Sequence, residues 1–250
     1  MRLDQYLVKN NYFKTRTKAQ MAIKARAIYV DNKLVIKPSL EVDDSSVINV
    51  IETNVLKYVS RGGLKLEGAI RAFNLDFRDK VVLDIGASTG GFTDCALKHG
   101  ASFVYAVDVG RNQLDASLKN NQQVLSLENT NILGLPKFNK DIDIIVLDCS
   151  FVSVTNLIKA LDYYVSKNNY LILLIKPQFE VGHIFLKNGI VKDKKLHLMA
   201  LNKVEDSLNQ VGLYINKIMK SPVTGGDGNQ EFLAYVSRNM TKKINFLSII

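Results

Sequence analysis

The stretch that decides the fold is Val81-Val82-Leu83-Asp84-Ile85-Gly86-Ala87-Ser88-Thr89-Gly90-Gly91. Its first five residues are an apolar, β-branched run that predicts a strand, and the glycine-rich turn 86–91 leads directly into a helical stretch, 92–98. A second predicted strand, 103–107, ends at Asp108. Glycines at a strand-to-helix turn let the backbone approach a ligand closely, and an acid about twenty residues further on can accept hydrogen bonds from ribose hydroxyls. The sequence therefore predicts a site for a nucleotide-like ligand at this turn.

Two nucleotide-like ligands compete for this turn, and a glycine turn that holds no ligand is the third interpretation. A dinucleotide-binding turn reads G-x-G-x-x-G, so that a pyrophosphate can rest on the helix N-terminus. Here Ser88 stands at the third position of the turn, and Asp84 precedes it. An acid there would repel a pyrophosphate but suits the cationic sulfonium and the amino acid portion of S-adenosylmethionine. The D-x-G-x-x-x-G-G pattern resembles motif I of class I methyltransferases, which implies S-adenosylmethionine as the cofactor.

The residues that we expect to hold this methyl donor come from the turn and from the ends of later strands. They are Asp84, Gly86, Ala87, Ser88, Thr89, Gly90, Gly91, Phe92, Asp108, Val109 and Asp148.

The rest of the chain alternates strands and helices, which is typical of a parallel α/β sheet. Strands are predicted at 144–147, at 170–175 and, as a closing hairpin around the loop 225–229, near 214–219 and 231–236; helices are predicted at 156–164 and near 195–210. A hairpin makes the last strand antiparallel to its neighbour. By analogy with methyltransferases, we predict an α/β fold: a class I (Rossmann-like) methyltransferase sheet with an antiparallel last strand.

Composition limits the class of protein. Of 250 residues, 47% are hydrophobic and 23% are charged, which excludes a disordered or fibrous chain. The two cysteines, Cys95 and Cys149, supply neither a disulfide scaffold nor a four-cysteine zinc site, and we predict no metal. Asp4 stands where a signal peptide needs an apolar core, and the longest apolar run, 170–175, is about a third of a membrane span. We therefore expect a soluble, cytoplasmic protein.

The formal net charge of +9 is concentrated at the N-terminus. Residues 1–40 contain nine bases against two acids, which indicates an anionic partner, although a charge run is also typical of a plain solvated face. Helical periodicity in 3–7 and 15–27 is followed by predicted strands at 28–30, 34–36 and 46–51, with a tight turn at Asp31-Asn32. The sequence thus begins with a small, basic α+β unit.

This order of elements resembles the S4 RNA-binding domain, through residues 2–4, 15–19 and 29–32. Two departures are Arg26 and Asn32, which stand where that family commonly has glycine; asparagine tolerates the left-handed turn. The resemblance implies that the unit binds RNA. The expected contacts are Arg2, Lys14, Arg16, Lys18, Lys24 and Arg26.

The residues at the strand ends indicate which atom is methylated. Amine-directed methyltransferases place Asn or Asp before Pro-Pro-Tyr, whereas this chain has Asp148-Cys149-Ser150-Phe151. Methylation of carbon 5 of a pyrimidine needs a nucleophilic cysteine, and Cys149 is more typical of a core thiol. A ribose hydroxyl needs a base that removes its proton as the oxygen attacks. A lysine can be that base where burial and nearby positive charge favour its neutral form.

Four residues offer such a base with its partners: Lys65, expected just before the first strand of the sheet, and Asp148, Lys176 and Glu231, expected at the ends of later strands. Each alone is more typical of an ordinary surface charge. Their K-D-K-E order is similar to that of the FtsJ-like ribose 2′-O-methyltransferases. The strings around them, 58–66, 148–153, 176–180 and 221–231, look like the TlyA family, also labelled haemolysin A.

The resemblance covers the chain to about residue 238 and implies 2′-O-methylation of ribosomal RNA, with cytidine as the expected nucleotide and ribosomal RNA or ribosomal subunits as the partner. It makes Lys176 the base and Lys65 the charge that tunes it, while Asp148 and Glu231 orient the lysines. It also implies a domain order: an S4-like domain at 1–55, a linker at 56–62, an FtsJ-like domain at 63–240 and a tail at 241–250.

Two other interpretations stay open. The haemolysin label suggests a membrane-active protein, which would need a spanning segment, a long amphipathic helix or a secretion signal, and we expect no membrane partner because the sequence shows none of these. An RNA- or ribosome-binding protein with an inactive methyltransferase domain is the other. The complete glycine turn and the four K-D-K-E positions count against that interpretation.

Overall fold

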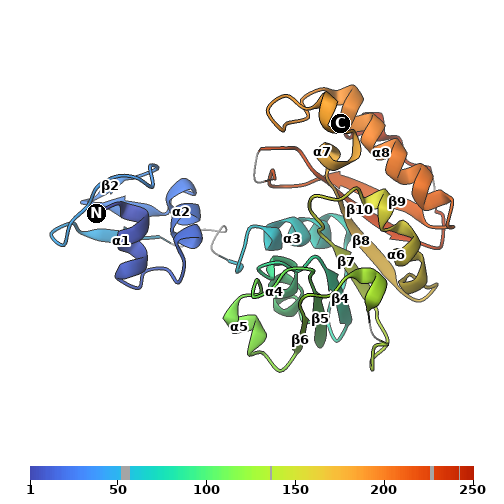
Figure 1. Ribbon diagram of the computed structural model, residues 1–250, viewed down its shortest axis with the longest axis horizontal. Coiled ribbons are helices and arrows are strands. Elements are labelled where there is room, and N and C mark those ends of the chain that lie inside the picture. Colours follow the sequence, from blue (N-terminus) through green and yellow to red (C-terminus); the bar gives the residue numbers. More distant parts are fainter. Residues whose placement is uncertain (52–56, 136, 226–227, 242) are drawn as a thin grey trace. The chain divides into compact units, whose positions relative to one another are not determined.

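The computed structural model describes residues 1–51, 57–135, 137–225, 228–241 and 243–250. The chain divides into two compact units, Met1–Arg61 and Gly62–Ile250, each with its own hydrophobic core (Figure 1). The expected end of the first domain at residue 55 and the start of the linker at residue 56 lie outside the described residues. The same is true of the middle of the glycine-rich loop, residues 226–227.

The N-terminal unit packs two helices against a small antiparallel sheet of order β2-β1-β3. Its elements are α1 (Leu3–Lys9), α2 (Arg16–Lys24), β1 (Ile28–Val30), β2 (Lys33–Leu34) and β3 (Ile48–Val50). Thr15 caps α2, because its side chain accepts a hydrogen bond from the Lys18 N–H (3.2 Å). Asp31 and Asn32 both have positive φ, as a tight two-residue hairpin turn requires. The predicted α+β unit is confirmed, with shorter second and third strands than expected.

A buried carboxylate fixes this unit. Asp4 is fully buried, and its oxygens accept hydrogen bonds from the side chains of Arg2 (3.1 Å), Arg16 (2.8 Å) and Gln20 (2.6 Å). The Arg2 side chain next to it, helped by Gln20 and Arg16, holds the pKa of Asp4 well below its usual range. Asp4 thus ties the start of α1 to α2 across the unit.

The C-terminal unit contains a seven-stranded sheet of order β6-β5-β4-β7-β8-β10-β9. The strands are β4 (Val81–Ile85), β5 (Phe103–Val107), β6 (Val124–Leu127), β7 (Ile144–Leu147), β8 (Tyr170–Ile175), β9 (Tyr214–Lys220) and β10 (Phe232–Ser237). The first five run parallel, and β10 is antiparallel to both β8 and β9. The predicted α/β class and antiparallel last strand are therefore confirmed; the sheet is Rossmann-like.

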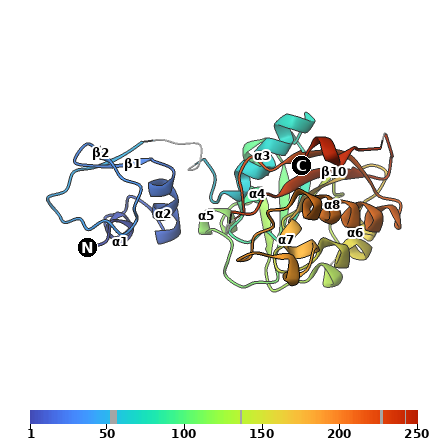
Figure 2. The same cartoon turned by 90° about the horizontal axis from the view of Figure 1, so that it is seen from above.

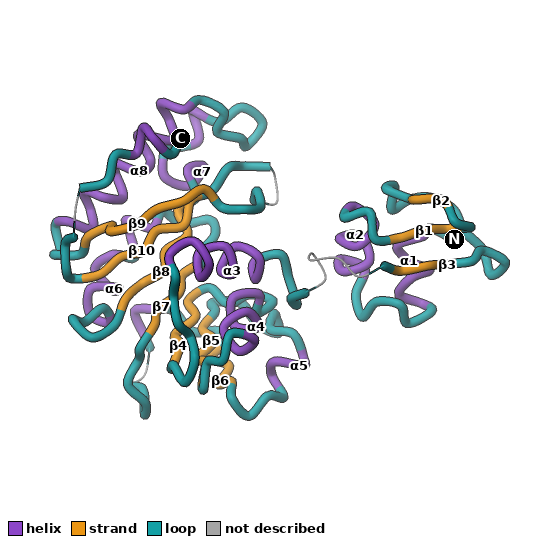
Figure 3. The backbone as a smooth tube through the Cα atoms, turned by 180° about the vertical axis from the view of Figure 1, so that it is seen from behind, coloured by secondary structure: helices purple, strands orange, loops and turns teal. Residues whose placement is uncertain are grey.

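Helices cover both faces of this sheet, which forms the middle layer (Figures 1 and 2). The helices are α3 (Gly62–Phe73), α4 (Gly91–Lys98), α5 (Ala116–Lys119), α6 (Ile158–Tyr164), α7 (Pro177–Glu180) and α8 (Lys194–Asn209). The view from behind places α3 over the β9–β10 side of the sheet, on the face opposite α6 and α8 (Figure 3). The core strands read as continuous apolar runs because both of their faces are buried.

The structure differs from the sequence prediction at two elements. Lys65 does not lie just before the first strand: it lies in α3, a helix that the sequence analysis did not predict. Strand β6 was also missed. Within the expected tail, residues 243–250 pack on the main core: Phe246 is buried there, with Ile249 and Ile250 packed against it.

The buried carboxylate of the N-terminal unit leads to a test of stability. Asp4→Asn keeps the shape of the side chain but removes its charge, so the unit should lose about 1–3 kcal/mol of unfolding free energy at neutral pH, as expected for hydrogen bonds to a charged group. Because the folded pKa of Asp4 is depressed, its stabilisation is present above the unfolded pKa of about 3.9 and lost as the pH falls below it. The deficit of the variant should therefore shrink in acid.

Hydrogen exchange of the amides in residues 1–51 of the full chain measures both effects. Equal protection in the variant and the parent at pH 7 would show that the Asp4 cluster contributes nothing to stability. A deficit that did not shrink in acid would contradict the electrostatic origin.

Candidate active site

The topology of the sheet gathers polar side chains at one edge. Because β5, β7 and β8 are parallel, Asp108, Asp148 and Lys176, which follow them directly, meet at their carboxyl ends. Glu231 reaches the same edge from the other direction, since β10 is antiparallel and its first residue, Phe232, pairs with the last residue of β8. Lys65 comes from α3, the first helix of the unit.

Four of these residues form a chain of alternating charge. Lys176 Nζ lies 2.6 Å from one oxygen of Asp148, and Lys65 Nζ lies 3.8 Å from the other. Lys65 Nζ also lies 2.6 Å from Glu231 Oε2. The order in space is Glu231, Lys65, Asp148 and Lys176. The structure thus brings together all four residues that the sequence predicts as catalytic.

This chain of charges is largely removed from water. The Lys65, Lys176 and Glu231 residues are buried, and the Asp148 side chain is 19% exposed. A buried charge costs several kcal/mol unless an opposite charge compensates it. Each lysine here has a carboxylate partner and each carboxylate a lysine, which compensates for their removal from bulk water.

Close backbone contacts place Glu231 and Lys65. A Cβ at Gly225 would lie 2.6 Å from Glu231 Oε1, so a larger residue there would displace that carboxylate. A Cβ at Gly68, one turn after Lys65 on α3, would similarly lie 2.8 Å from Pro222 Cγ. The segment 221–225 thus presses against both α3 and Glu231. This contact explains why Lys65 can be contributed by a helix.

A cavity of about 450 Å³ opens beside Asp148, at the ends of β4, β5 and β7. Its size suits a small organic ligand. Of the residues predicted to hold the donor, Gly86, Ser88, Asp108, Val109 and Asp148 line it. Asp108 accepts hydrogen bonds from the backbone N–H groups of Ser88 and Gly110, both at 2.7 Å. Its carboxylate is thereby fixed at the cavity wall between the turn and the β5 loop.

The other predicted donor residues lie outside the lining of this cavity. Asp84 is fully buried inside β4, where one oxygen accepts a hydrogen bond from Thr93 Oγ1 (2.6 Å). Burial raises the pKa of Asp84 to about 7, against the effect of the Thr93 hydrogen bond. The expected donor contact of Asp84 stays a prediction: the residue is buried next to the turn and is not part of the cavity lining. The remaining predicted residues that are absent from the lining are Ala87, Thr89, Gly90, Gly91 and Phe92.

The β6 side of the cavity was missed in the sequence, because β6 itself was not predicted. Gln113, Thr130, Asn131 and Ile132 line the cavity from the loops after β5 and β6. Glu128 holds the first loop: its carboxylate accepts hydrogen bonds from the backbone N–H groups of residues 112–114 and pairs with Lys119 (2.7 Å). Lys119 and these N–H groups lower the pKa of Glu128 to about 2. The signal available in the sequence was Glu128, which lies three to four residues before the lining residues Asn131 and Ile132.

The loop after β7 adds further residues that sequence reasoning left unassigned. Lys176 Nζ donates a hydrogen bond to Ser150 Oγ (2.7 Å). Phe151 is 93% exposed, lines the cavity and has a φ of +65°, a strained conformation for a bulky residue. Its ring centroid lies 5.7 Å from that of Phe179.

The buried Glu180 of α7 anchors the same loop. Its carboxylate accepts hydrogen bonds from the Val154 N–H (2.8 Å) and the Ser153 hydroxyl (2.5 Å). Lys203 of α8 donates to the backbone carbonyl of Glu180 (2.8 Å). The segment that follows Lys176 thus holds the segment that follows Asp148, and the two catalytic candidates are connected through α7.

Cys149 lines the cavity but is unsuited to nucleophilic attack. It is half-buried, and its Sγ lies 3.9 Å from the Ile85 carbonyl oxygen. Burial, together with the negative charge of Asp148, raises the pKa of Cys149 to about 12. The thiol therefore stays protonated at neutral pH, and the thiolate is the reactive form.

The predicted RNA-contacting bases fall into two groups in the N-terminal unit. Arg2 and Arg16 donate to the buried Asp4, so part of their hydrogen-bonding capacity serves the fold. Lys14, Lys24 and Arg26 are exposed, and Lys18 is half-buried. Arg26 has a φ of +62°, the conformation that explains a glycine at this position in S4 domains.

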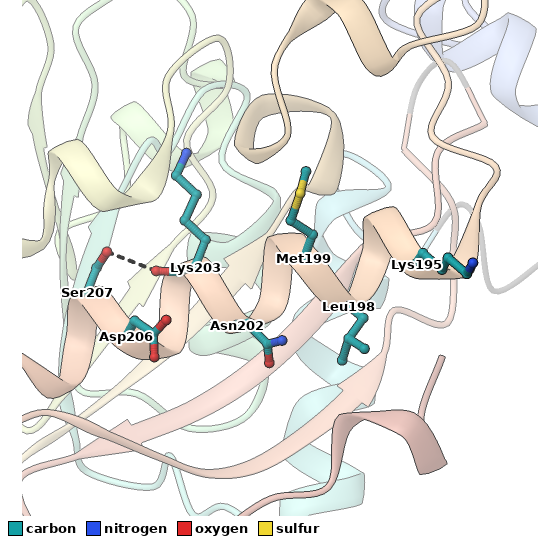
Figure 4. A pocket seen from close by; sticks show the side chains of 7 residues that line it. All are labelled: Lys195, Leu198, Met199, Asn202, Lys203, Asp206 and Ser207. Atoms are coloured by element: carbon teal, nitrogen blue, oxygen red, sulfur yellow. Dashed lines mark hydrogen bonds between the residues drawn. The ribbon is translucent and has the colours of Figure 1, made fainter.

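Two other hollows lack such a convergence of groups. One is a groove along α8, lined by side chains of that helix alone, including Met199 and Lys203 (Figure 4). The other, near Phe138 and Tyr163, lies at the opposite edge of the sheet. In the part of the chain that the structure describes, no cluster of side chains could hold a metal ion.

Comparisons with known proteins agree with this geometry. Residues 58–238 match the FtsJ-like methyltransferase family, and residues 1–48 match the S4 domain. The chain is 41% identical to "Hemolysin A" of Brachyspira hyodysenteriae, covering 94% of this chain and 99% of that protein. It is 35% identical to "16S/23S rRNA (cytidine-2'-O)-methyltransferase TlyA" of Mycobacterium tuberculosis, covering 94% and 89%.

A solved, hemolysin-named structure from Streptococcus thermophilus is 36% identical, with a TM-score of 0.74, covering 94% of this chain and 87% of that chain. The resemblance noted in the sequence is thereby confirmed over nearly the whole chain. The chain belongs to the FtsJ-like methyltransferase family, with an S4 domain in front of the methyltransferase domain and S-adenosylmethionine as its cofactor.

Proposed function

We propose that this protein transfers a methyl group from S-adenosylmethionine to the ribose 2′-hydroxyl of a cytidine in ribosomal RNA, with Lys176 as the general base. The observation that carries the proposal is the buried row of alternating charges beside the cavity, formed by Glu231, Lys65, Asp148 and Lys176. The substrate is supported by the name of the M. tuberculosis relative.

The cavity fits the methyl donor in size and in polar groups. Asp108, with its carboxylate fixed at the wall, is placed to accept hydrogen bonds from ribose hydroxyls. Gly86 has a φ of +81° and lies against the Asp148 backbone oxygen, so the turn is close to the loop after β7. Ser88 and Val109, which are also predicted to contact the donor, line the same cavity. When bound, S-adenosylmethionine supplies a methyl carbon attached to a positively charged sulfur.

Lys176 is the residue that we assign to proton removal. A ribose hydroxyl is a weak acid, so its proton must leave as the oxygen attacks the methyl carbon. In this step the O–H bond breaks and its proton moves to the neutral amine of Lys176. The O–C bond forms as the bond between the methyl carbon and the donor sulfur breaks, and the sulfur keeps that electron pair and becomes neutral. Lys176 is buried, and Asp148, 2.6 Å from its nitrogen, holds the amine in place.

Asp148 is shared between the two lysines, and this sharing indicates the role of Lys65 and Glu231. If Lys65 were absent, Asp148 would interact with Lys176 alone. Lys65 draws on the same carboxylate, at 3.8 Å, and Glu231 in turn neutralises Lys65 at 2.6 Å. We therefore assign Lys65 and Glu231 to tuning and orientation rather than to proton transfer.

The S4 domain supports RNA, and in particular ribosomal RNA, as the partner, because nine bases against two acids lie in its residues 1–40. The hemolysin name belongs to other proteins, and in the described part of this chain no helix is long and apolar enough to cross a membrane. The assembled charge chain favours an active enzyme over an inactive RNA-binding protein.

The donor site is tested by Asp108→Ala. Removing the carboxylate that we expect to face the donor ribose should weaken S-adenosylmethionine binding at least tenfold, about the cost of one hydrogen bond to a charged group. Calorimetry on the purified variant measures this affinity, with circular dichroism as the check on folding. An unchanged affinity in a folded variant would remove Asp108 from the donor site.

The RNA contact is tested by removing exposed charge from the S4 domain. The double variant Lys14→Ala, Lys24→Ala should bind RNA more weakly, and the slope of log affinity against log salt should fall by roughly 0.7–0.9 for each phosphate that is no longer neutralised. Lys140→Ala, Lys167→Ala is the matched control, because it removes two exposed lysines of the methyltransferase domain that shortly precede β7 and β8, at the opposite edge of the sheet. Equal losses of affinity in the two double variants would indicate non-specific attraction.

The assignment of the base is tested by two substitutions of Lys176. Lys176→Ala should lower the methylation rate by about a hundredfold to ten-thousandfold, the usual contribution of a general base, while donor and RNA affinities stay nearly unchanged. Lys176→Arg should fail as well, because a guanidinium keeps its proton near neutral pH. An Arg variant that methylates at the parent rate would make Lys176 an electrostatic positioner.

A further inference from the structure

The loop after β7 contributes a second oxygen to Lys176 besides Asp148. Lys176 Nζ lies 2.6 Å from Asp148 Oδ1 and donates a hydrogen bond to Ser150 Oγ at 2.7 Å. Both oxygens come from one short stretch of chain, residues 148–150, whose side chains also line the cavity. Lys176 itself is buried, so few water molecules compete for its protons.

These two contacts matter because of the number of N–H bonds on the Lys176 nitrogen. A neutral lysine amine has two N–H bonds and one lone pair, and only the lone pair can accept a proton. If Asp148 and Ser150 take both N–H bonds, the lone pair must occupy the remaining position on the nitrogen. With Asp148 alone, the amine could rotate about its Cε–Nζ bond and turn the lone pair away from a substrate hydroxyl.

We propose that Ser150 is a positioning residue for catalysis: its hydroxyl accepts the second N–H of Lys176 and thereby aims the lone pair of the neutral amine at the substrate hydroxyl. This inference rests on the proposed function, since it takes Lys176 as the base. It adds a fifth residue to the four that the K-D-K-E pattern supplies.

The loop is built so that Ser150 stays in place. Phe151, the next residue, has a φ of +65°, and such strain persists only where the surroundings enforce it. On one side the loop continues from the buried strand β7. On the other side Glu180 fixes the Val154 N–H and the Ser153 hydroxyl. Without these contacts, the loop would not hold the exposed Ser150 side chain in place.

The central experiment compares Ser150→Ala with Ser150→Thr in the full-length enzyme. Loss of orientation of a reacting group costs up to about a hundredfold in rate, so Ser150→Ala should lower kcat by about ten- to a hundredfold, with KM for donor and RNA within about twofold. Threonine keeps the hydroxyl, and position 150 is exposed enough to take its methyl group. Ser150→Thr should therefore keep kcat within about threefold of the parent.

Ser102→Ala is the matched control, because it removes a serine hydroxyl at the amino end of β5, where it bonds only the backbone carbonyls of Asp79 and Lys80. It should leave kcat unchanged. Circular dichroism and donor calorimetry on each variant separate a folding defect from a kinetic one.

A double-mutant cycle with Lys176→Ala separates this inference from the proposed function. If Ser150 acts through Lys176, Ser150→Ala should cause no further loss in the Lys176→Ala background. An additive loss, an unchanged kcat in Ser150→Ala, or a rise in donor KM alone would overturn the role of Ser150 while leaving Lys176 as the base. Full activity of Lys176→Ala would instead overturn the proposed function, and the role of Ser150 with it.

Discussion

The structure of the methyltransferase domain depends on the pairing of charges that are buried at one edge of its sheet. Two lysines and two carboxylates lie there with little access to water, and any one of them alone would be strongly unfavourable. The pairing can be complete only if α3, β7, β8 and β10 all bring their residues to the same place. Elements from the start and the end of the domain are thereby held to one arrangement. The same pairing supplies what the chemistry needs, an amine in a dry site with a carboxylate to hold it.

Pattern and order in the sequence predicted much of this arrangement. Apolar runs identified strands β4, β5, β7 and β8, because strands that are buried on both faces need no alternation of polar residues. Asp108, Asp148 and Lys176 could be assigned to one edge because parallel strands end on the same side. Sequence reasoning did not predict α3, the helix that carries Lys65, because α3 precedes the sheet and is placed by packing against distant parts of the chain, including Pro222. The motif indicates a ligand contact for Asp84, but it does not reveal that this residue is fully buried in β4.

The residues that no motif revealed act through contacts between loops. Ser150, Glu128 and Glu180 each sit near a predicted position, but their roles depend on which backbone N–H or amine lies opposite them. Such partners are distant in the chain, as with Glu180 and Val154, and local patterns carry no information about them. The strained φ of Phe151 is another property that only coordinates show. In this protein, sequence patterns predict the charged groups, and tertiary contacts determine how those groups are aimed.

The N-terminal unit follows the same physical rule on a smaller scale, and this changes how its charge should be counted. Asp4 is buried and compensated by Arg2 and Arg16, so these two bases stabilise the fold as well as adding to the positive surface. Their guanidinium groups are partly exposed and keep a share of their donors for an outside partner. The exposed Lys14, Lys24 and Arg26 have no such structural duty among the hydrogen bonds and ion pairs of the described residues. Their charge therefore meets less internal competition, whereas Asp4 offsets one of the charges of Arg2 and Arg16 within the net +7 of residues 1–40.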